Sequence, residues 1–353
     1  MKKNFLFLAA CALLLTVGCE KDPKPTNPTN DGNYAYVLNE GAWGGNDAGI
    51  SRLNIKDGTI EVDWFDKANG RGLGDVAQDL IRYGSHLYVA VYESNTLEVI
   101  DPETGRSVKQ IDMGTRGPRY LLGYNGKVYV TCYDKTVLRI DTTSFDIEAT
   151  CQLSGMQPEQ MCVVDGKMYV CNTWEYDSDG NAVYDSTISE VDLGSFTEVR
   201  KITVGTNPGR IKALPNHRVL VVCNGDYYGD EAASTLVVNV ADGSQTTLPL
   251  AATNVEVCGN DVYFYITSYD AYWNNLTATF YKMDANTLQT TPILENMSST
   301  LKNAYSINVD ATTGDLYVCN SPYGVAADVY RFDKNGTQTL KVEAGSMASK
   351  VVF

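Results

Sequence analysis

The chain repeats one pattern of alternating apolar and polar positions seven times. Each repeat contains a short apolar strand with the same central pair, and these pairs are Tyr36-Val37, Tyr88-Val89, Tyr129-Val130, Tyr169-Val170, Val221-Val222, Tyr263-Phe264 and Tyr317-Val318. Successive pairs lie 52, 41, 40, 52, 42 and 54 residues apart. A period of about forty residues that holds only short strands is typical of one propeller blade. The pattern therefore predicts an all-β chain folded as a seven-bladed β-propeller.

The repeat from Gly114 to Leu153 shows how one blade is expected to be built. Four short strands are predicted, at 118–122, 127–132, 136–141 and 146–153. Asn125-Gly126 joins the first two, and this dipeptide is a strong signal for a two-residue hairpin. An Asp ends the third strand, where its carboxylate is expected to accept hydrogen bonds from the next turn. The same position recurs as Asp101, Asp192, Asp284 and Asp333.

Each end of the repeat region lacks part of a blade. Residues 345–353 resemble residues 205–213, so they predict a first strand that no second strand follows. The first repeat begins at its second strand, residues 34–39. We expect the C-terminal strand to join the N-terminal blade, which closes the ring and leaves no open edge.

The segment before the repeats has the features of a secretion signal. Three residues, Met1-Lys2-Lys3, precede an apolar run over residues 5–17 that is too short to span a bilayer. The small residues before Cys19 resemble a bacterial lipobox, which implies cleavage after residue 18 and lipidation of Cys19. Residues 20–33 carry three prolines and no apolar residue, so residues 19–33 are expected to form a flexible tether. The propeller is then expected to span residues 34–353.

Composition and the small number of histidines exclude several classes of function. The chain has 43 acidic against 28 basic residues, so we expect no nucleic-acid partner and no membrane contact beyond the lipid anchor. His86 and His217 are its only histidines, and both fall in turns between first and second strands. Because these turns lie opposite the more variable loops, a Ser-His-Asp triad or a histidine metal centre is excluded among those loops. We therefore expect no metal and no enzyme activity.

Seven cysteines follow Cys19, and three of them share one position in the repeat. Cys171, Cys223 and Cys319 each come directly after the apolar pair, where other repeats have residues such as Ala90. We interpret them as buried free thiols between blades.

The candidate site follows from the loops between second and third strands. In an antiparallel blade these loops share one face, here called the loop face, with the links to the next blade; the opposite face is called the hairpin face. The loops contain three of the four tryptophans, among many Tyr, Asn, Asp and Gly residues. Turns need Gly, Asn and Asp but not large rings, and rings mixed with amides are typical of a binding surface. In the alternative interpretation, the rings form small cores inside the loops themselves.

The residues expected to contact a ligand are of three kinds. They are the loop rings Trp43, Trp174, Tyr176, Tyr227, Tyr228, Tyr272, Trp273 and Tyr323, the strand-end amides Asn172, Asn224 and Asn320, and Arg119 and Arg210 beside the central channel.

Two stretches of sequence resemble known families. Val99-Ile100-Asp101-Pro102-Glu103-Thr104-Gly105, followed by Gly114 and Pro118, resembles the YncE-type seven-bladed propellers. Leu38-Asn39-Glu40-Gly41-Ala42-Trp43-Gly44, together with the lipoprotein start, resembles the BtuG family of Bacteroidetes surface lipoproteins. The second resemblance implies capture of vitamin B12 or another corrinoid, with cobalamin as the ligand and no cofactor. It further implies a lipid-anchored position on the outer membrane, facing the exterior, and a TonB-dependent, BtuB-like transporter as partner.

Two other functions remain open from the residues alone. A glycan-binding module of a nutrient-uptake system would stack sugar rings on Trp43, Trp174 and Trp273. A hydrolase or lactonase would use carboxylates and a metal ion.

Overall fold

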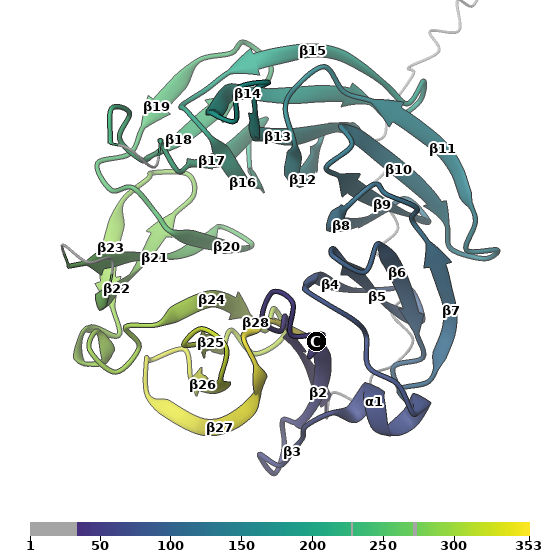
Figure 1. Ribbon diagram of the computed structural model, residues 1–353. Coiled ribbons are helices and arrows are strands. Elements are labelled where there is room, and N and C mark those ends of the chain that lie inside the picture. Colours follow the sequence, from purple (N-terminus) through teal and green to yellow (C-terminus); the bar gives the residue numbers. More distant parts are fainter. Residues whose placement is uncertain (1–33, 227–228, 271–273) are drawn as a thin grey trace, which may run out of the picture.

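Seven four-stranded antiparallel sheets surround a common axis in the computed structural model, which describes residues 34–226, 229–270 and 274–353 (Figure 1). Each sheet is one blade, with one strand beside the axis and its fourth strand at the rim of the ring. The predicted all-β, seven-bladed propeller is confirmed.

The blades follow one another around the ring in chain order. From the axis outward, the first three blades are β28 (Ala348–Val352), β1 (Tyr34–Asn39), β2 (Gly49–Asn54) and β3 (Ile60–Glu61); β4 (Ala77–Tyr83), β5 (His86–Val91), β6 (Thr96–Ile100) and β7 (Ser107–Asp112); β8 (Pro118–Tyr124), β9 (Lys127–Cys132), β10 (Thr136–Asp141) and β11 (Ile147–Gln152). The next two are β12 (Pro158–Val164), β13 (Lys167–Tyr176), β14 (Ala182–Asp192) and β15 (Thr197–Thr203); β16 (Pro208–Leu214), β17 (Arg218–Cys223), β18 (Ser234–Asn239) and β19 (Gln245–Thr247). The last two are β20 (Asn254–Cys258), β21 (Asp261–Tyr269), β22 (Asn275–Asp284) and β23 (Thr290–Ile293); β24 (Ala304–Val309), β25 (Leu316–Asn320), β26 (Ala326–Phe332) and β27 (Gln338–Ser346).

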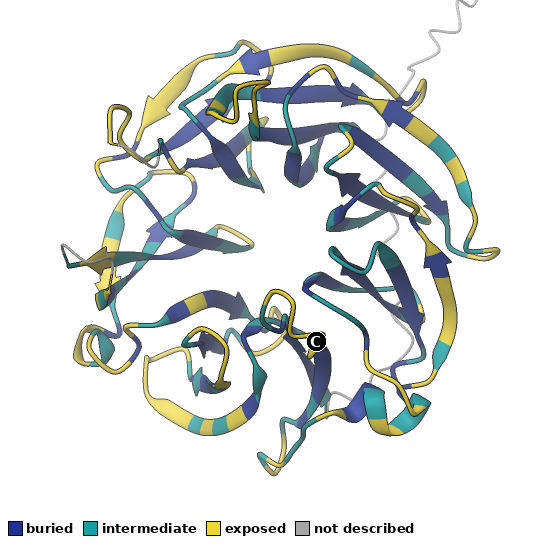
Figure 2. Cartoon of the chain, viewed as in Figure 1, coloured by how far each residue is buried: buried dark blue, intermediate teal, exposed yellow. Residues whose placement is uncertain are grey.

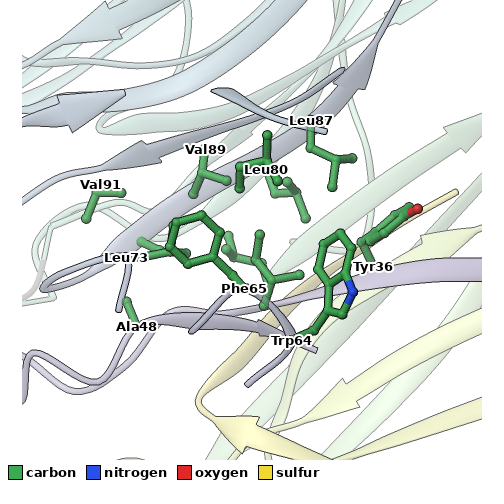
Figure 3. Packing of buried hydrophobic residues seen from close by; sticks show 13 residues of the cluster. Tyr36, Ala48, Trp64, Phe65, Leu73, Leu80, Leu87, Val89 and Val91 are labelled. Atoms are coloured by element: carbon green, nitrogen blue, oxygen red, sulfur yellow. The ribbon is translucent and has the colours of Figure 1, made fainter. Parts of the chain in front are cut away.

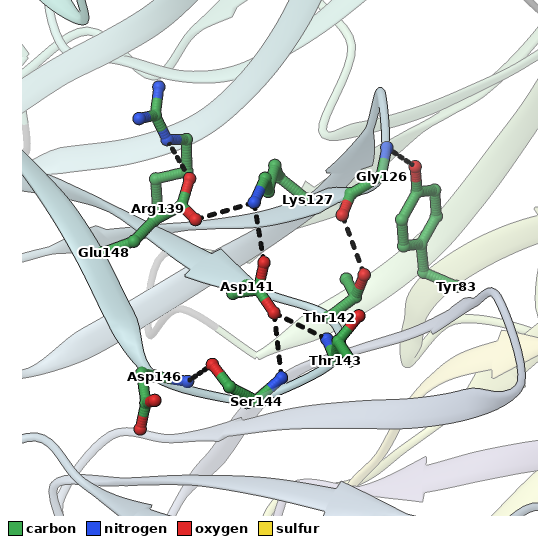
Figure 4. A network of polar contacts seen from close by, with 10 residues as sticks. All are labelled: Tyr83, Gly126, Lys127, Arg139, Asp141, Thr142, Thr143, Ser144, Asp146 and Glu148. Carbon is green, nitrogen blue, oxygen red and sulfur yellow. Dashed lines mark hydrogen bonds and ion pairs between the residues drawn. The ribbon is translucent and has the colours of Figure 1, made fainter.

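The turn chemistry expected from the sequence is present on the hairpin face. Asn125 and Gly126 join β8 to β9 with φ angles of 46° and 75°, as a two-residue hairpin turn requires. Asp141 ends β10 and accepts hydrogen bonds from the backbone N–H groups of Thr143 and Ser144, each at 2.8 Å (Figure 4). Lys127 also bonds the Asp141 carboxylate, and these bonds together lower its pKa. Asp101, Asp192, Asp284 and Asp333 accept backbone bonds in the same way.

The ring closes as predicted from the two incomplete blades. β28 pairs antiparallel with β1, with Val352 opposite Tyr36 and Val351 opposite Val37. The innermost strand of the first blade therefore comes from the C-terminal end of the chain, and its other three strands come from the N-terminal end.

Apolar cores lie between neighbouring blades, so the inner strands are buried and the rim strands are largely exposed (Figure 2). The core between the first two blades contains Trp64 and Phe65, which are 3% and 0% exposed (Figure 3). The Trp64 ring packs at 5.3 Å from that of Tyr36. Trp64 is the one tryptophan that was not predicted to lie in a loop between a second and a third strand, and it is thus a core residue.

Part of the first repeat lies away from the loop face. Some of the extra length of this repeat forms α1 (Trp64–Asn69) at the rim. Asn69 at the end of α1 donates to the carbonyl oxygen of Gly105, which lies in a turn on the hairpin face. Because β3 has only two residues, the side chains of α1 cover core that a longer outer strand covers in other blades.

All seven cysteines of the described residues are free and six of them are buried. Among these six are Cys171, Cys223 and Cys319, which were predicted to be buried free thiols. Cys162, Cys171 and Cys223 belong to one apolar core between the fourth and fifth blades. Burial raises the pKa of the Cys171 thiol well above its usual value, which keeps it protonated and unreactive.

Close contacts explain why glycine occurs at two positions near the junctions between blades. A Cβ atom on Gly155 would lie 2.1 Å from Cγ of Asn172, and one on Gly345 would lie 2.7 Å from Cγ of Asn39. Both asparagines are buried, so they have little room to move away.

We expect Gly155→Ala to lower the free energy of unfolding by about 1–3 kcal/mol, the usual cost of overpacking a well-filled site. Chemical denaturation measures this change. Gly49→Ala is the matched control, because the nearest atom to its added Cβ lies at an ordinary 3.7 Å. Equal stability of the two variants would contradict the close contact.

Candidate functional site

Large apolar side chains are exposed mainly on the loop face. Of the ten most exposed within the described residues, Val108 and Val199 lie on rim strands, and the other eight lie in or beside the loops of this face: Trp43, Tyr176, Val183, Tyr269, Leu276, Tyr305, Tyr323 and Val325. Soluble proteins rarely gather apolar side chains on one face without a partner or ligand. The distribution therefore marks the loop face as the candidate site.

Two hairpins project from this face. In the fourth blade, β13 and β14 stay paired as far as Tyr176 opposite Ala182, and in the sixth blade β21 and β22 pair as far as Tyr269 opposite Asn275. The second strands of the other blades have only five or six residues. Lys135 of the third blade holds the first hairpin by an ion pair with Glu175, at 2.7 Å.

The rings on the hairpin of the fourth blade partly contact one another. The ring of Trp174, which is half-buried, lies edge-on to that of Tyr176, with centroids 4.9 Å apart, and 6.5 Å from that of Tyr184. Tyr176 itself is 67% exposed. This hairpin thus has a small ring cluster of its own and still presents one ring to solvent.

Trp43 and Tyr323 are the most exposed rings of the described chain, at 70% and 72%. The loop of Trp43 is fixed by hydrogen bonds from Ala42 N–H to Asp47 and from Gly44 N–H to Asp75, both 2.9 Å long. Because the loop is held by these bonds, it presents the indole without burying it.

Arg119 forms the centre of a second aromatic group, nearer the axis. Its guanidinium lies 4.8 Å from the ring centroid of Tyr92 and 4.5 Å from that of Tyr133. These two rings belong to the loops that follow the second strands of the second and third blades. Glu159 accepts from the same guanidinium at 2.9 Å and from the Tyr133 hydroxyl. Arg119 is therefore already paired and serves to fix the rings around it.

A polar cavity of about 80 Å³ lies beside these groups, at the ends of the inner strands. Its polar lining includes Glu40, Gln78, Tyr120, Gln160, Arg210, Asn254, Tyr305 and Ser349. Burial raises the pKa of Glu40 to about 7, although its hydrogen bond with Tyr305 and the charges of Arg119 and Arg210 act to lower it. Glu40 therefore changes its charge near neutral pH.

The predicted asparagines do not all reach the surface. Asn172 is fully buried, and its amide donates to the hydroxyls of Thr187 and Ser189 at 2.9 and 3.0 Å. Asn320 is 8% exposed and accepts from the backbone N–H of Asn303. These two residues hold strands and links together inside their blades, and only Asn224 is exposed.

Other predicted residues lie outside the described part of the chain. These are Tyr227, Tyr228, Tyr272 and Trp273 in the loops, and Cys19 in the N-terminal segment. The signal and tether segments, residues 1–33, also lie outside it.

Tyr305, Glu40 and Tyr120 were not predicted as residues of the site. A signal for Tyr305 was available, because Ala304 pairs with the last residue of its second strand as Pro118 does. Tyr305 therefore occupies in β24 the position that Arg119 occupies in β8.

The described residues include no group of three or more His, Cys, Asp or Glu side chains arranged to hold a metal ion. The helices in this part of the chain are too short or too polar to cross a membrane.

Comparison with known proteins gives a family and a fold. Residues 33–346 match the family model described as Domain of unknown function (DUF5074). None of the curated proteins matches the chain.

Three solved structures resemble the chain at low sequence identity. A Bacteroides fragilis protein provisionally assigned as a 6-phosphogluconolactonase is 11% identical with a TM-score of 0.62, over 93% of this chain and 100% of that one. Hydrazine synthase from Kuenenia stuttgartiensis is 13% identical with a TM-score of 0.59, over 72% and 76%. The Neurospora crassa Pan2 WD40 domain is 8% identical with a TM-score of 0.55, over 78% and 80%. At these identities the likeness supports the fold alone.

Proposed function

Since this chain belongs to the DUF5074 family, whose function is unknown, we propose a function from its own geometry and sequence. The protein is a cell-surface lipoprotein that captures vitamin B12 or a related corrinoid on its loop face. It then passes the ligand to a TonB-dependent outer-membrane transporter. Lipidation of Cys19 and the resemblance to BtuG lipoproteins, both read from the sequence, supply the location and the partner in this proposal.

The observation that carries the proposal is that exposed apolar side chains, five of them rings, share the loop face with a polar cavity. Eight of the ten exposed apolar side chains lie in or beside the loops of this face, and amide, phenol and guanidinium groups line the cavity. A corrinoid is a broad disc with amide side chains at its edge. Rings supply apolar contact area for such a disc, and the polar groups supply directional hydrogen bonds.

In this proposal the protein binds its ligand and catalyses no reaction on it. His86 and His217 both lie on the hairpin face, beside the turns β4–β5 and β16–β17. A corrinoid on the loop face would therefore keep its cobalt free of a histidine ligand from the protein.

Titration of the purified protein with cyanocobalamin by calorimetry tests the proposal. We expect saturable heat at micromolar ligand, with a shift in the visible spectrum of the corrinoid. Absence of both signals would rule out the proposed ligand.

Loss of the two most exposed rings should weaken this binding. We expect the double variant Trp43→Ala, Tyr323→Ala to bind cyanocobalamin at least about tenfold more weakly, because each buried ring contributes about 1.5–3 kcal/mol. Val199→Ala is the control, since Val199 is 51% exposed but lies on the rim strand β15. Equal affinities for the double variant and the control would count against the loop face.

Glycan binding is the second candidate, and the exposure of Trp43 and Tyr323 favours it. Each ring presents more than two thirds of its surface to solvent, as stacking on a sugar requires. A glycan array separates the two candidates, because a corrinoid carrier is expected to give no signal on it.

A further inference from the structure

Among the described residues, one cation that lines the cavity on the loop face forms no ion pair. Six charged residues line it: Glu40, Asp79, Arg210, Lys212, Glu256 and Lys350. Lys350 pairs with Asp79 at 2.6 Å, and Lys212 pairs with Glu256 at 2.9 Å. Glu40 and Arg210 are left, and neither forms an ion pair with any residue in the described part of the chain.

Within the described residues, nothing accepts a hydrogen bond from the Arg210 guanidinium. The groups near it are the phenols of Tyr120, Tyr265 and Tyr305 and the carboxylate of Glu159, and this carboxylate is already paired with Arg119. The Arg210 side chain is half-buried, and its guanidinium has five N–H donors in a fixed planar fork. Leaving such a group without acceptors costs free energy unless a ligand supplies them.

Further unsatisfied polar atoms lie around the same cavity. Gln160 Oε1 and Ser349 Oγ are buried and have no hydrogen-bond partner within the described part of the chain, and both residues line the cavity. Its volume of about 80 Å³ suits one small group of a few heavy atoms, since a water molecule occupies about 30 Å³.

From this arrangement we infer that the cavity is a subsite for a singly charged oxyanion group, a carboxylate or a phosphodiester, held by the Arg210 guanidinium. Two parallel N–H···O bonds from Arg210 fit either group. The Ser349 hydroxyl supplies a further donor at its edge.

Glu40 makes the subsite sensitive to pH. The groups around its carboxyl are Tyr305, Arg119, Arg210 and Glu159, with the pairs Asp79–Lys350 and Lys212–Glu256 also lining the cavity. Arg119 is neutralised by Glu159, so the balance in the cavity depends on Glu40 and Arg210. Below the Glu40 pKa of about 7, Glu40 is neutral and the cavity carries one positive charge. Above it, the Glu40 carboxylate competes with the ligand for Arg210.

Anion affinity is therefore expected to fall by about tenfold between about pH 6 and pH 8, because binding requires one proton on Glu40. Glu40→Gln should remove this pH dependence and keep the affinity at its low-pH value. An unchanged pH profile in Glu40→Gln would show that another group controls the cavity.

Dimethyl phosphate and acetate are suitable probes, since neither titrates between these pH values. Saturation-transfer NMR on their methyl groups, at constant ionic strength, measures binding to the purified protein. We expect Arg210→Gln to weaken binding at least tenfold, and Arg210→Lys to retain part of it. Arg106→Gln is the matched control, since it removes the same charge from an exposed position on the hairpin face.

Equal binding by Arg210→Gln and wild type, or no binding of either probe to wild type, would overturn the inference. If Arg210→Gln does not fold, Ser349→Asp provides a second test. It places a carboxylate in the cavity and should abolish binding, and retained binding would overturn the inference equally.

Comparison of two corrinoids identifies the source of the anion, and this step rests on the proposed function. Cobalamin carries a phosphodiester in its nucleotide loop, and cobinamide is the same ring system without it. Tighter binding of cobalamin that disappears in Arg210→Gln assigns the subsite to that phosphodiester. Equal binding of the two assigns it to a separate carboxylate or phosphodiester. Binding of dimethyl phosphate without any corrinoid binding would retain the subsite and reject the proposed function.

Discussion

Truncation of the chain after Met347 is expected to abolish cooperative folding of the propeller. The deletion removes β28, the innermost strand of the first blade, and exposes one edge of β1. It also removes the buried side chains of Ala348 and Val351 and the partner of the buried Asp79 carboxylate. A large apolar side chain contributes about 1.5–3 kcal/mol on burial, and an uncompensated buried charge costs about 3–5 kcal/mol. Their sum approaches the total stability of many proteins, about 5–15 kcal/mol.

Circular dichroism during thermal unfolding measures this effect. A circular permutant is the control: it joins residue 352 to residue 34 through Asn-Gly and opens the chain between Gly84 and Ser85. All strand pairs are retained, so we expect this variant to unfold cooperatively. A truncated chain that melts cooperatively within a few degrees of the full protein would contradict the account of ring closure.

The second large effect is expected for Asp79→Ala, which removes a contact shared by three blades. Asp79 lies on β4, and its side chain is only 4% exposed. One carboxylate oxygen pairs with Lys350 of β28 at 2.6 Å, and the other accepts from the N–H of Leu121 on β8 at 2.9 Å. The variant leaves both donors without a partner, so we expect a loss of about 3 kcal/mol in the free energy of unfolding.

Chemical denaturation of three variants tests this assignment. Asp261→Ala is the matched control, because the Asp261–Lys282 pair has a similar distance of 2.8 Å but both side chains are 40% exposed. An exposed pair contributes below about 1 kcal/mol. Asp79→Ala combined with Lys350→Met should recover part of the loss, since no charge is then left unpaired. A single Asp79→Ala variant as stable as Asp261→Ala would refute the role of Asp79.

Local sequence patterns were sufficient to predict the fold. The apolar pairs mark the second strands, and the turn residues mark the hairpins, because both depend on residues close together in the chain. Ring closure was also predictable, since residues 345–353 resemble another first strand. Helix α1 was not, because Trp64 and Phe65 pack as core side chains of a blade without following the strand pattern.

The candidate site was predictable only in part. Trp43, Tyr176 and Tyr323 stood out because turns have no need of large rings. Asn172 and Asn320 did not differ in sequence from ligand-binding amides, and their burial follows from contacts inside the blade. Glu40 and Tyr305 form a hydrogen bond, but they lie far apart in the sequence. They could not be predicted as partners, because only the closing of the ring brings these parts of the chain together.

Hydrogen–deuterium exchange with and without cyanocobalamin tests the central claim, that the loop face takes up an external ligand. The account predicts slower exchange in peptides covering residues 40–47, 172–184 and 321–325, with no change at the hairpin-face turns 84–86, 165–167 and 215–218. Protection of the hairpin-face turns, with unchanged exchange in the loops, would contradict it.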